Sequence, residues 1–548
     1  MFRGPWFGFA GFALLAVIPV VLFGYPWEQY DFIFHFSSWQ DYGQALMQGN
    51  LHPAWSEQAN YGLGSPRHVF YPPLSLLTGG LLSLLLPDRM IGGGMIWLFT
   101  LLCSITCWYL APRRLERRER ALVAVLAAFG FGMINTGLIR FAMADMLACA
   151  LFPLLLLQLI RMRERRAGSL PGMALVAAGM WLADIPLAIA SAYLMGMVTL
   201  YCCLQDRSPR LLWRYLLAYV ASIALVAWYL VPAMAARSWI SEANLGVSHR
   251  SLLEVNDLVG KSSAVLLISL LALGVCLLAL TWWRQRLDER SEVLAVLGVS
   301  ALLLQMPGVL ELFYALPLAD RIGYWFRFFF FVSLALPMVA FAVSRARLLR
   351  GLVIFAYGLF FLCALYFIAG QGPASQPDNP DYYQPTAQVL KRHQQGFTGY
   401  PEYINPATDA QVVARPAERP DSTISASTGC QATLQGSQLQ SLTVATRSGH
   451  TCTYTLARYA FPWWQIRLDG QALSHGHDER GLLTVTVPAG EHKLAMQFER
   501  PLPLVLSGWA ITLATLLIMS WLSWRRRAWR GLGSVSTQYD PAPGSTRA

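Results

Sequence analysis

The chain has 548 residues, of which 55% are hydrophobic and only 13% are charged. A soluble protein of this length would carry about 25% charged residues, so the composition excludes an ordinary soluble domain. The net charge of +11 does not indicate nucleic-acid binding, because arginines gather in short loops between apolar runs, as the positive-inside rule predicts for cytoplasmic loops. These clusters lie at 113–120, 161–166, 284–290, 345–350 and 525–530.

Apolar runs of roughly 17–23 residues predict a polytopic α-helical membrane protein with about twelve transmembrane helices and both termini cytoplasmic. The first is an uncleaved helix at Phe7–Gly24, followed by an external loop at 25–74. Pro72–Pro87 is expected to be a juxtamembrane or re-entrant helix, because a full span there would move the arginines at 113–120 outside. The other predicted spans are Ile91–Ala111, Ala121–Ile139, Met146–Ile160, Pro171–Ala183, Pro186–Leu204, Leu211–Val231, Ser263–Trp283, Val293–Met306, Phe326–Val343, Gly351–Gly370 and Pro503–Trp524.

The region at 371–502 differs from the transmembrane domain at 1–370. A Pro/Gln/Asp-rich linker is followed by segments of alternating apolar and polar residues, such as SLTVATRS and CTYTLARYA, separated by turn signals. We predict a small extracytoplasmic β-sandwich, then a final helix at 503–524 and a disordered cytoplasmic tail at 525–548. Cys430 and Cys452 could form a disulfide in an oxidising compartment.

The first external loop contains the candidate catalytic residues. Asp31 follows the first helix directly, at the outer membrane interface, where a carboxylate can act as a general base toward an acceptor hydroxyl. A solvated loop acid or a helix cap is the simpler alternative. His35 would share a helical face with Asp31 and could orient it or bind a phosphate, or be an ordinary interfacial residue. Asp41 is the second candidate acid.

Charged residues at the outer ends of later spans are candidates for binding a lipid phosphate, since charges at such positions are costly and tend to be paired or functional. Arg140 could hold the phosphate while Asp145 positions it, or the two could form a plain salt bridge. Arg321 and Arg327 are similar candidates. Asp184 could face the same cavity or cap a helix. No convincing metal site is visible.

The order of motifs in the loop resembles that of GT-C glycosyltransferases. Within that superfamily it is most similar to the bacterial membrane proteins labelled "6-pyruvoyl-tetrahydropterin synthase-related", a label that implies no pterin chemistry. The motif residues are Asp31, His35, Gly49, Pro53, Trp55, Gly62, Gly64, Pro66 and Phe70 to Leu74, including Tyr71. Later matches are Arg140–Pro153, Trp228–Met234, Tyr324–Phe331, Pro401–Pro406, Phe461–Gln471 and Pro488–Phe498. Asp145 stands where glutamate is more usual, and the proline often found before the arginine of the Tyr324–Phe331 motif is missing.

The resemblance implies a glycosyltransferase of the bacterial inner membrane with an essential aspartate, here Asp31, at the base of its first loop. It would transfer a sugar from a polyprenyl-phosphate donor to an extracytoplasmic glycan or lipid. The expected substrate-binding residues are Arg140, Asp145, Arg321, Arg327 and Tyr71. Some relatives use a divalent cation. A non-catalytic scaffold or a transporter of lipid-linked glycans is the alternative.

Overall fold

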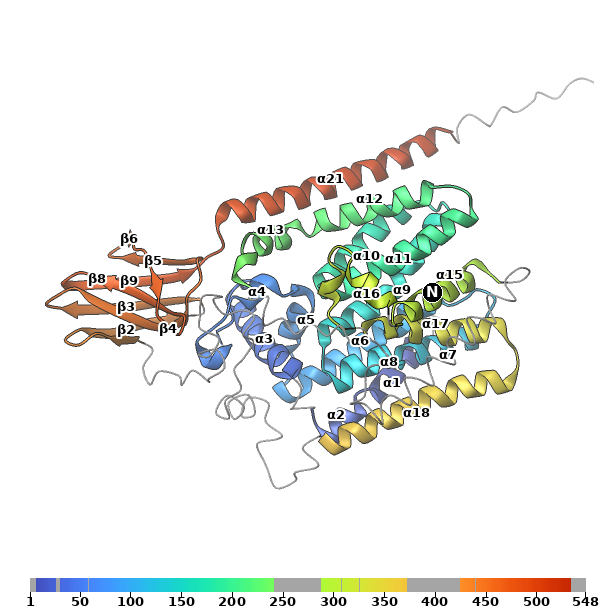
Figure 1. Ribbon diagram of the computed structural model, residues 1–548, viewed down its shortest axis with the longest axis horizontal. Coiled ribbons are helices and arrows are strands. Elements are labelled where there is room, and N and C mark those ends of the chain that lie inside the picture. Colours follow the sequence, from blue (N-terminus) through green and yellow to red (C-terminus); the bar gives the residue numbers. More distant parts are fainter. Residues whose placement is uncertain are drawn as a thin grey trace, which may run out of the picture.

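The computed structural model describes residues 6–25, 30–57, 59–240, 287–306, 308–324, 326–371, 424–438 and 440–533. A bundle of helices forms most of the molecule, and a region of β-strands lies at one end of it (Figure 1). The last helix, α21 (Leu502–Gly533), runs from the strand region back along the bundle. The predicted span Ser263–Trp283, most of the linker, Pro401–Pro406 and the end of the tail lie outside the described residues.

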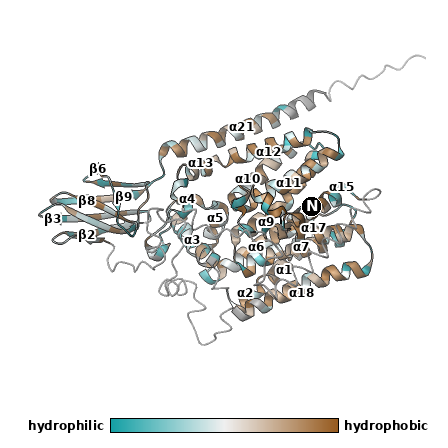
Figure 2. Ribbon diagram, viewed as in Figure 1, coloured by the Kyte–Doolittle hydropathy of each residue, from teal (hydrophilic) through white to brown (hydrophobic). Residues whose placement is uncertain are grey.

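Seven helical stretches of the described chain are long and apolar enough to cross a membrane, or up to eight if the bent pair α12 and α13 is one span. Apolar residues dominate these helices, whereas the strands carry more polar ones (Figure 2). The stretches are α1–α2 (Trp6–Leu15, Ile18–Phe23), α6 (Asp88–Leu110), α7–α8–η2 (Arg117–Ala128, Phe131–Ile134, Asn135–Ile139), α9 (Met143–Arg163), α11 (Ile185–Gln205), α18 (Arg347–Gln371) and α21; the bent pair is α12–α13 (Arg210–Leu225, Ala227–Ala235).

The described helices do not reach the predicted number of about twelve spans. Three predicted spans correspond to the shorter helices α10 (Ser169–Ala183), α15 (Glu289–Leu303) and α17 (Arg327–Val343). Even the longest of them, with 17 residues, extends only about 26 Å, less than a hydrocarbon core of about 30 Å. Residues 328–342 of α17 are all buried, so neighbouring helices cover it. The sequence showed the apolar character of α17 but not its burial within the bundle.

The predicted external loop at 25–74 is largely helical. Its main element is α3 (Tyr30–Met47), and a short helix, α5 (Pro73–Ser83), packs against it. A Cβ atom on Gly79 of α5 would lie 2.1 Å from the Trp39 ring of α3, so this close approach requires glycine. The length of α5, 11 residues, agrees with a helix that does not span. The remaining short elements are η1 (Asn60–Gly62), α4 (Arg67–Phe70), η3 (Arg237–Trp239), α16 (Val309–Tyr314) and η7 (Ala319–Ile322).

Loops that contain the arginine clusters lie together. Arg350 Nη1 is 2.6 Å from Glu119 Oε1, which joins the start of α18 to the start of α7. Arg163 Nη2 is 2.7 Å from Asp206 Oδ1, which joins the ends of α9 and α11. The turn from α17 to α18 lies at the end of the bundle opposite the strands (Figure 1). These contacts agree with helices that alternate in direction.

The strand region contains two antiparallel sheets, with strand orders β1-β4-β8-β7 and β2-β3-β9-β5-β6. Buried side chains from both sheets belong to one apolar cluster, which includes Val444, Tyr454, Val485 and Leu494. The predicted alternating segments therefore do form strands. They are β1 (Ile424–Ala426), β2 (Gln431–Gln438), β3 (Ser441–Ser448), β4 (Cys452–Tyr459), β5 (Trp464–Leu468), β6 (Gln471–Ala472), β7 (Gly476–His477), β8 (Leu482–Val487) and β9 (Gly490–Phe498).

Candidate functional site

Asp31 lies in the first turn of α3 and contacts an arginine from a distant segment. Arg140 Nη2 donates a hydrogen bond to Asp31 Oδ2 at 3.3 Å. An acidic residue in a first helical turn is favoured by the partial positive charge of the helix N-terminus. The Asp31 side chain keeps 35% of its surface accessible, and Arg140 keeps 20%. The hydrogen bond therefore fixes the two side chains relative to each other, and both remain partly accessible to solvent.

Arg140 is positioned by an irregular backbone between two helices. The π-helical turn η2 ends immediately before it, and Phe141 immediately after it has a φ of 59°. Such turns recur at functional sites, and a bulky residue with positive φ is costly. Phe141 is fully buried, with its ring centroid 4.9 Å from that of Phe32 and 5.4 Å from that of Tyr25. This packing holds the strained segment that presents Arg140.

Asp145, in the first turn of α9, joins two guanidinium groups. Arg140 Nη1 donates to Asp145 Oδ2 at 2.8 Å, while Arg327 Nε and Nη2 donate to Oδ2 and Oδ1, each at 3.4 Å. Arg327, the first residue of α17, also donates through Nη1 to the carbonyl of Ile322. The salt-bridge alternative for Arg140 and Asp145 is therefore correct as geometry, but it belongs to a cluster with Asp31 and Arg327.

Two aromatic rings that were not among the predicted site residues complete the arginine cluster. The Arg140 guanidinium lies 4.7 Å from the ring centroid of Phe326, and that of Arg327 lies 5.5 Å from the ring of Tyr324. The two rings stack on each other at 5.0 Å. Such cation–π contacts favour a fixed guanidinium plane. Both belong to the Tyr324–Phe331 motif, but the sequence did not show that their rings contact the arginines.

Asp184 caps a helix, which is one of its two alternative roles. Its Oδ1 accepts a hydrogen bond from the Leu187 amide at 2.7 Å and so caps α11. The Asp184 side chain is buried and lies near Asp145.

The environment of Asp31 suits a general base. Protein atoms surround the carboxyl on most sides although part of it remains accessible, and this burial raises the pKa of Asp31, with Arg140 opposing the effect. A raised pKa strengthens a carboxylate as a base as long as it stays ionised at the working pH. The ion pair with Arg140 favours the ionised form.

His35 lies one turn after Asp31 but is enclosed by aromatic rings. Its ring stacks on Trp39 at 5.9 Å and meets the edge of Tyr71 at 5.9 Å. Burial lowers the pKa of His35 to about 3, so the imidazole is neutral. The hydrogen bonds of the described residues include none between His35 and Asp31. The structure thus places His35 and Tyr71 in a group of packed aromatic rings, one helical turn from Asp31.

Asp41 and Arg321 lie outside the cluster. Asp41 is ten residues beyond Asp31, about 15 Å along the helix. It is fully buried, accepts a hydrogen bond from Ser56 Oγ and lies 3.7 Å from Arg67 Nη2. It therefore anchors the chain after α3 and is not placed as a second acid beside Asp31. The Arg321 side chain is about one-third exposed, and its Nε lies 3.4 Å from Oδ2 of its neighbour Asp320.

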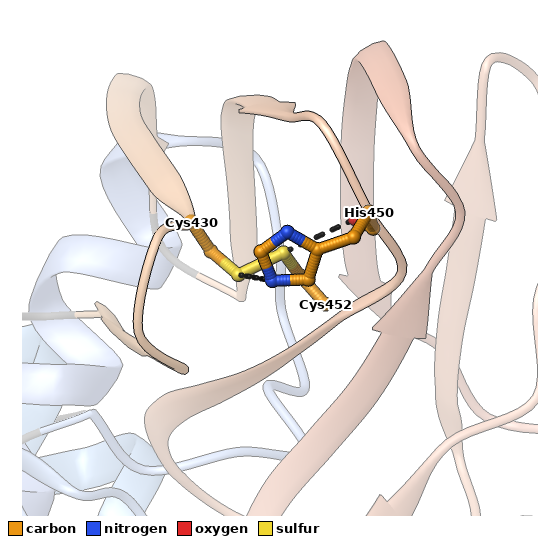
Figure 3. Close-up of side chains that lie close together, drawn as sticks. All are labelled: Cys430, His450 and Cys452. Carbon is orange, nitrogen blue, oxygen red and sulfur yellow. Dashed lines mark hydrogen bonds between the residues drawn. A yellow bond between two sulfur atoms is a disulfide. The ribbon is translucent and has the colours of Figure 1, made fainter.

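A separate group of possible metal ligands lies in the strand region. Within the described part of the chain, Cys430, His450 and Cys452 are the one set of three such side chains close enough for a single ion (Figure 3). Cys430 and Cys452 form a disulfide, with their Cα atoms 6.2 Å apart, as the sequence suggested. The disulfide removes both thiolates, so only His450 remains as a ligand, and the group does not fit a metal in this state.

A comparison with protein-family models gives no match, and a comparison with curated proteins finds no significant similarity. The function must therefore be argued from the arrangement of Asp31, Arg140, Asp145 and Arg327.

Proposed function

We propose that this protein is a membrane glycosyltransferase of the GT-C type that transfers a sugar from a polyprenyl-phosphate donor to an extracytoplasmic glycan or lipid. One observation carries the proposal: a partly accessible carboxylate, Asp31, is bonded to Arg140, and Asp145 holds a second guanidinium, that of Arg327, beside it. Such a site offers a base and an anion-binding pair within one cluster.

In the proposed reaction, Asp31 takes the proton of an acceptor hydroxyl. The oxygen attacks the anomeric carbon, and the bond between that carbon and the phosphate oxygen breaks. The electron pair leaves with the polyprenyl phosphate, whose growing charge is stabilised by Arg140 and Arg327. One inversion of configuration follows from this single displacement. The unused N–H groups of the two guanidiniums are available for the phosphate, since each has five donors.

The proposed location is the bacterial inner membrane, with the strand region, folded as a β-sandwich, on the extracytoplasmic side. The basic loops meet at the end of the bundle away from the strands, where the positive-inside rule would put the cytoplasm. The Cys430–Cys452 disulfide in the strand region suits an oxidising compartment. Both observations favour the same orientation.

The alternative is a scaffold or transporter of lipid-linked glycans that keeps the anion-binding arginines without catalysis. The observation that favours it is the ion pair of Asp31 itself, which could serve only to hold Arg140 in place. The two hypotheses differ in what they require of Asp31. An enzyme needs an ionisable carboxylate there, whereas a scaffold needs only a hydrogen-bond acceptor.

The decisive experiment compares Asp31→Asn with Asp88→Asn, the matched control, because Asp88 is also an acid in the first turn of a helix. Each variant replaces the wild type in a strain that lacks the gene, and envelope glycans and lipid-linked intermediates are analysed at equal protein levels. We expect Asp31→Asn to lose one sugar modification with accumulation of the unmodified acceptor. An unchanged glycan profile would favour the scaffold.

A further inference from the structure

The disulfide of the strand region has an imidazole beside it. Cys430 lies just before β2, Cys452 is the first residue of β4, and His450 lies in the turn that joins β3 to β4. The Nε2 atom of His450 is 3.8 Å from Cys430 Sγ (Figure 3). His450 is exposed, Cys430 is partly buried and Cys452 is buried. Solvent therefore reaches the group from the side of His450.

The position of the imidazole matches that of a metal ligand. The two sulfur atoms of any disulfide are close together, so the informative atom is Nε2 of His450. In a tetrahedral zinc site with a Zn–S distance of about 2.3 Å and a Zn–N distance of about 2.0–2.1 Å, a sulfur ligand and a nitrogen ligand lie about 3.6 Å apart. The distance of 3.8 Å between Cys430 Sγ and His450 Nε2 is close to this value.

Hydrogen bonds other than the disulfide hold the three residues near one another. The Ser427 amide donates to the Thr453 carbonyl at 3.2 Å, and the Thr453 amide donates to Ser427 Oγ at 3.3 Å. These bonds fix the turn before β2 against β4. Gly429 leaves room for His450, since a Cβ atom there would lie 3.0 Å from His450 Cε1, and its φ of 83° favours glycine. The three side chains should therefore stay close when the S–S bond is broken.

We infer that Cys430, Cys452 and His450 bind one zinc ion once the disulfide is reduced. Two thiolates and one imidazole are ligands that zinc prefers, and the two sulfur atoms then separate to about 3.8 Å. Within the described residues, no fourth side chain of this kind joins the group, so a water molecule completes the tetrahedron. This site is separate from the proposed glycosyl transfer and does not depend on it.

The step from the disulfide to the zinc site balances with a protein dithiol as the reductant. A thiolate of the dithiol attacks Cys430, the more accessible sulfur, and Cys452 leaves as a thiolate. The second thiol of the reductant then displaces Cys430, so two electrons pass to the cysteines and the reductant becomes a disulfide. Zinc replaces the two thiol protons, which are released to solvent. The redox state thus selects a covalent cross-link or a metal site at the same position.

The test measures zinc on the full-length protein in detergent micelles, before and after reduction by a phosphine. Excess phosphine is removed, zinc alone is added at about pH 7, and the metal that stays bound after gel filtration is measured by atomic emission. We expect about one zinc ion more per chain in the reduced protein than in the oxidised protein. Cysteines that are free in both states contribute equally and cancel in the difference.

Variants assign the zinc to its ligands. Cys430→Ser/Cys452→Ser should abolish the zinc that depends on reduction. His450→Gln should raise the Kd for zinc of the reduced protein by at least about tenfold, measured by competition with a chelating dye. The matched control is His477→Gln, at an exposed histidine of β7, which should change the Kd by less than about twofold.

A second readout needs no variant, in case the double serine variant does not fold. In the reduced wild type, zinc should slow the alkylation of Cys430 and Cys452 by iodoacetamide at least about tenfold, because a zinc-bound thiolate is a weaker nucleophile. Mass spectrometry of the labelled peptides gives the rates. Alkylation of Cys363 on α18 is the internal control and should not respond to zinc.

Three results would overturn the inference. They are equal zinc content in the two redox states, alkylation of Cys430 and Cys452 that zinc does not slow, and an unchanged Kd in His450→Gln, since the imidazole would then not be a ligand. None of them bears on the anion site near Asp31. That site is tested separately by binding of methyl farnesyl phosphate, a phosphodiester with one negative charge.

Discussion

Arg458 of strand β4 and Glu57 of the loop after α3 form an ion pair, with Nη2 2.9 Å from Oε2. Their side chains are 15% and 17% exposed. The Gln440 amide donates to the same carboxylate, and Arg458 also donates to the carbonyl of Gly62. The segment 48–66, which connects α3 to α4, is thus held by the strand region through several bonds at once.

Breaking this pair should loosen the strand region from the helices. We expect Arg458→Ala, Glu57→Gln and the double variant to give a coupling free energy of about 1–2 kcal/mol for unfolding in a double-mutant cycle. The matched control is the pair Arg447–Glu491, which is about three-quarters exposed and should couple by less than about 0.5 kcal/mol. Equal coupling in the two pairs would contradict a structural role for the Glu57 contact.

A second prediction concerns the contact between α5 and α3. Gly79→Ala would place a Cβ atom 2.1 Å from the Trp39 ring, so the helices must separate, at a cost of about 1–3 kcal/mol. Gly351→Ala, on α18, meets nothing within 4 Å and should not destabilise the protein. The measurement is thermal unfolding in detergent. Equal midpoints for the two variants would show that α5 does not pack closely on α3.

The anion site predicts a difference between two arginines. Arg327→Lys removes the fork that holds both oxygens of Asp145 and should weaken binding of methyl farnesyl phosphate by about tenfold or more. Arg321→Lys should change the Kd by less than about twofold, because Arg321 is paired with Asp320 outside the cluster. Calorimetric titration gives both values. A larger effect at Arg321 would restore its predicted role as a phosphate ligand and displace Arg327.

A pair in the strand region predicts a pH dependence of stability. His492 Nδ1 lies 2.7 Å from Asp469 Oδ2, and this hydrogen bond raises the pKa of His492. The pKa of Asp469 is lowered, first by the hydrogen bond from the Lys493 amide and then by His492. The stability that His492 contributes is complete below about pH 6.5, the ordinary pKa of histidine. It is lost as the pH rises through the raised pKa of His492 in the folded protein. The stability that Asp469 contributes is present above about pH 3.9, the ordinary pKa of aspartate, and is lost as the pH falls through its lowered pKa.

Stability should therefore be higher at about pH 5.5 than at about pH 8.5 by an amount that His492→Gln removes. Denaturant unfolding followed by tryptophan fluorescence measures it. His477→Gln, at an exposed histidine of β7, is the control and should leave the pH difference unchanged. If His492→Gln unfolds with the wild-type pH dependence, the pair does not act as described.

The sequence identified the charged residues of the site but not their connections. Asp31 was selected because a carboxylate at the outer membrane interface can act as a general base, and Arg140 and Arg327 because charges at the ends of spans are costly. Their meeting depends on packing between segments that are 109 and 182 residues apart, which no local pattern encodes. Asp184 illustrates the limit, because the sequence left two roles open and only the structure shows the cap on the Leu187 amide.

The same limit applies to the fold. The alternation of apolar and polar residues predicted the strands, because successive side chains of a strand point to opposite faces of the sheet. Strand β3 begins and ends where the segment SLTVATRS does. The count of about twelve spans is not confirmed, because α10, α15 and α17 are shorter than the candidate spans, and apolar composition predicts a helix but not its exact length. Asp41 was the second candidate acid, and the structure places it beside Ser56 and Arg67, which come from a segment whose path only the tertiary structure shows.

Trp55 is fully buried, with its ring 5.0 Å from that of Trp464 and 4.9 Å from that of Phe498. The segment that contains it thus completes its packing against residues made much later, as the separation of 383 residues between Glu57 and Gln440 shows. At about 5–20 residues per second, a ribosome needs about 20–80 s to make that stretch. During this time the nascent chain carries Trp55 with its final ring partners still unsynthesised. Packing of the segment 48–66 is therefore a late event in the biogenesis of this protein, completed only when β5 and β9 have been made.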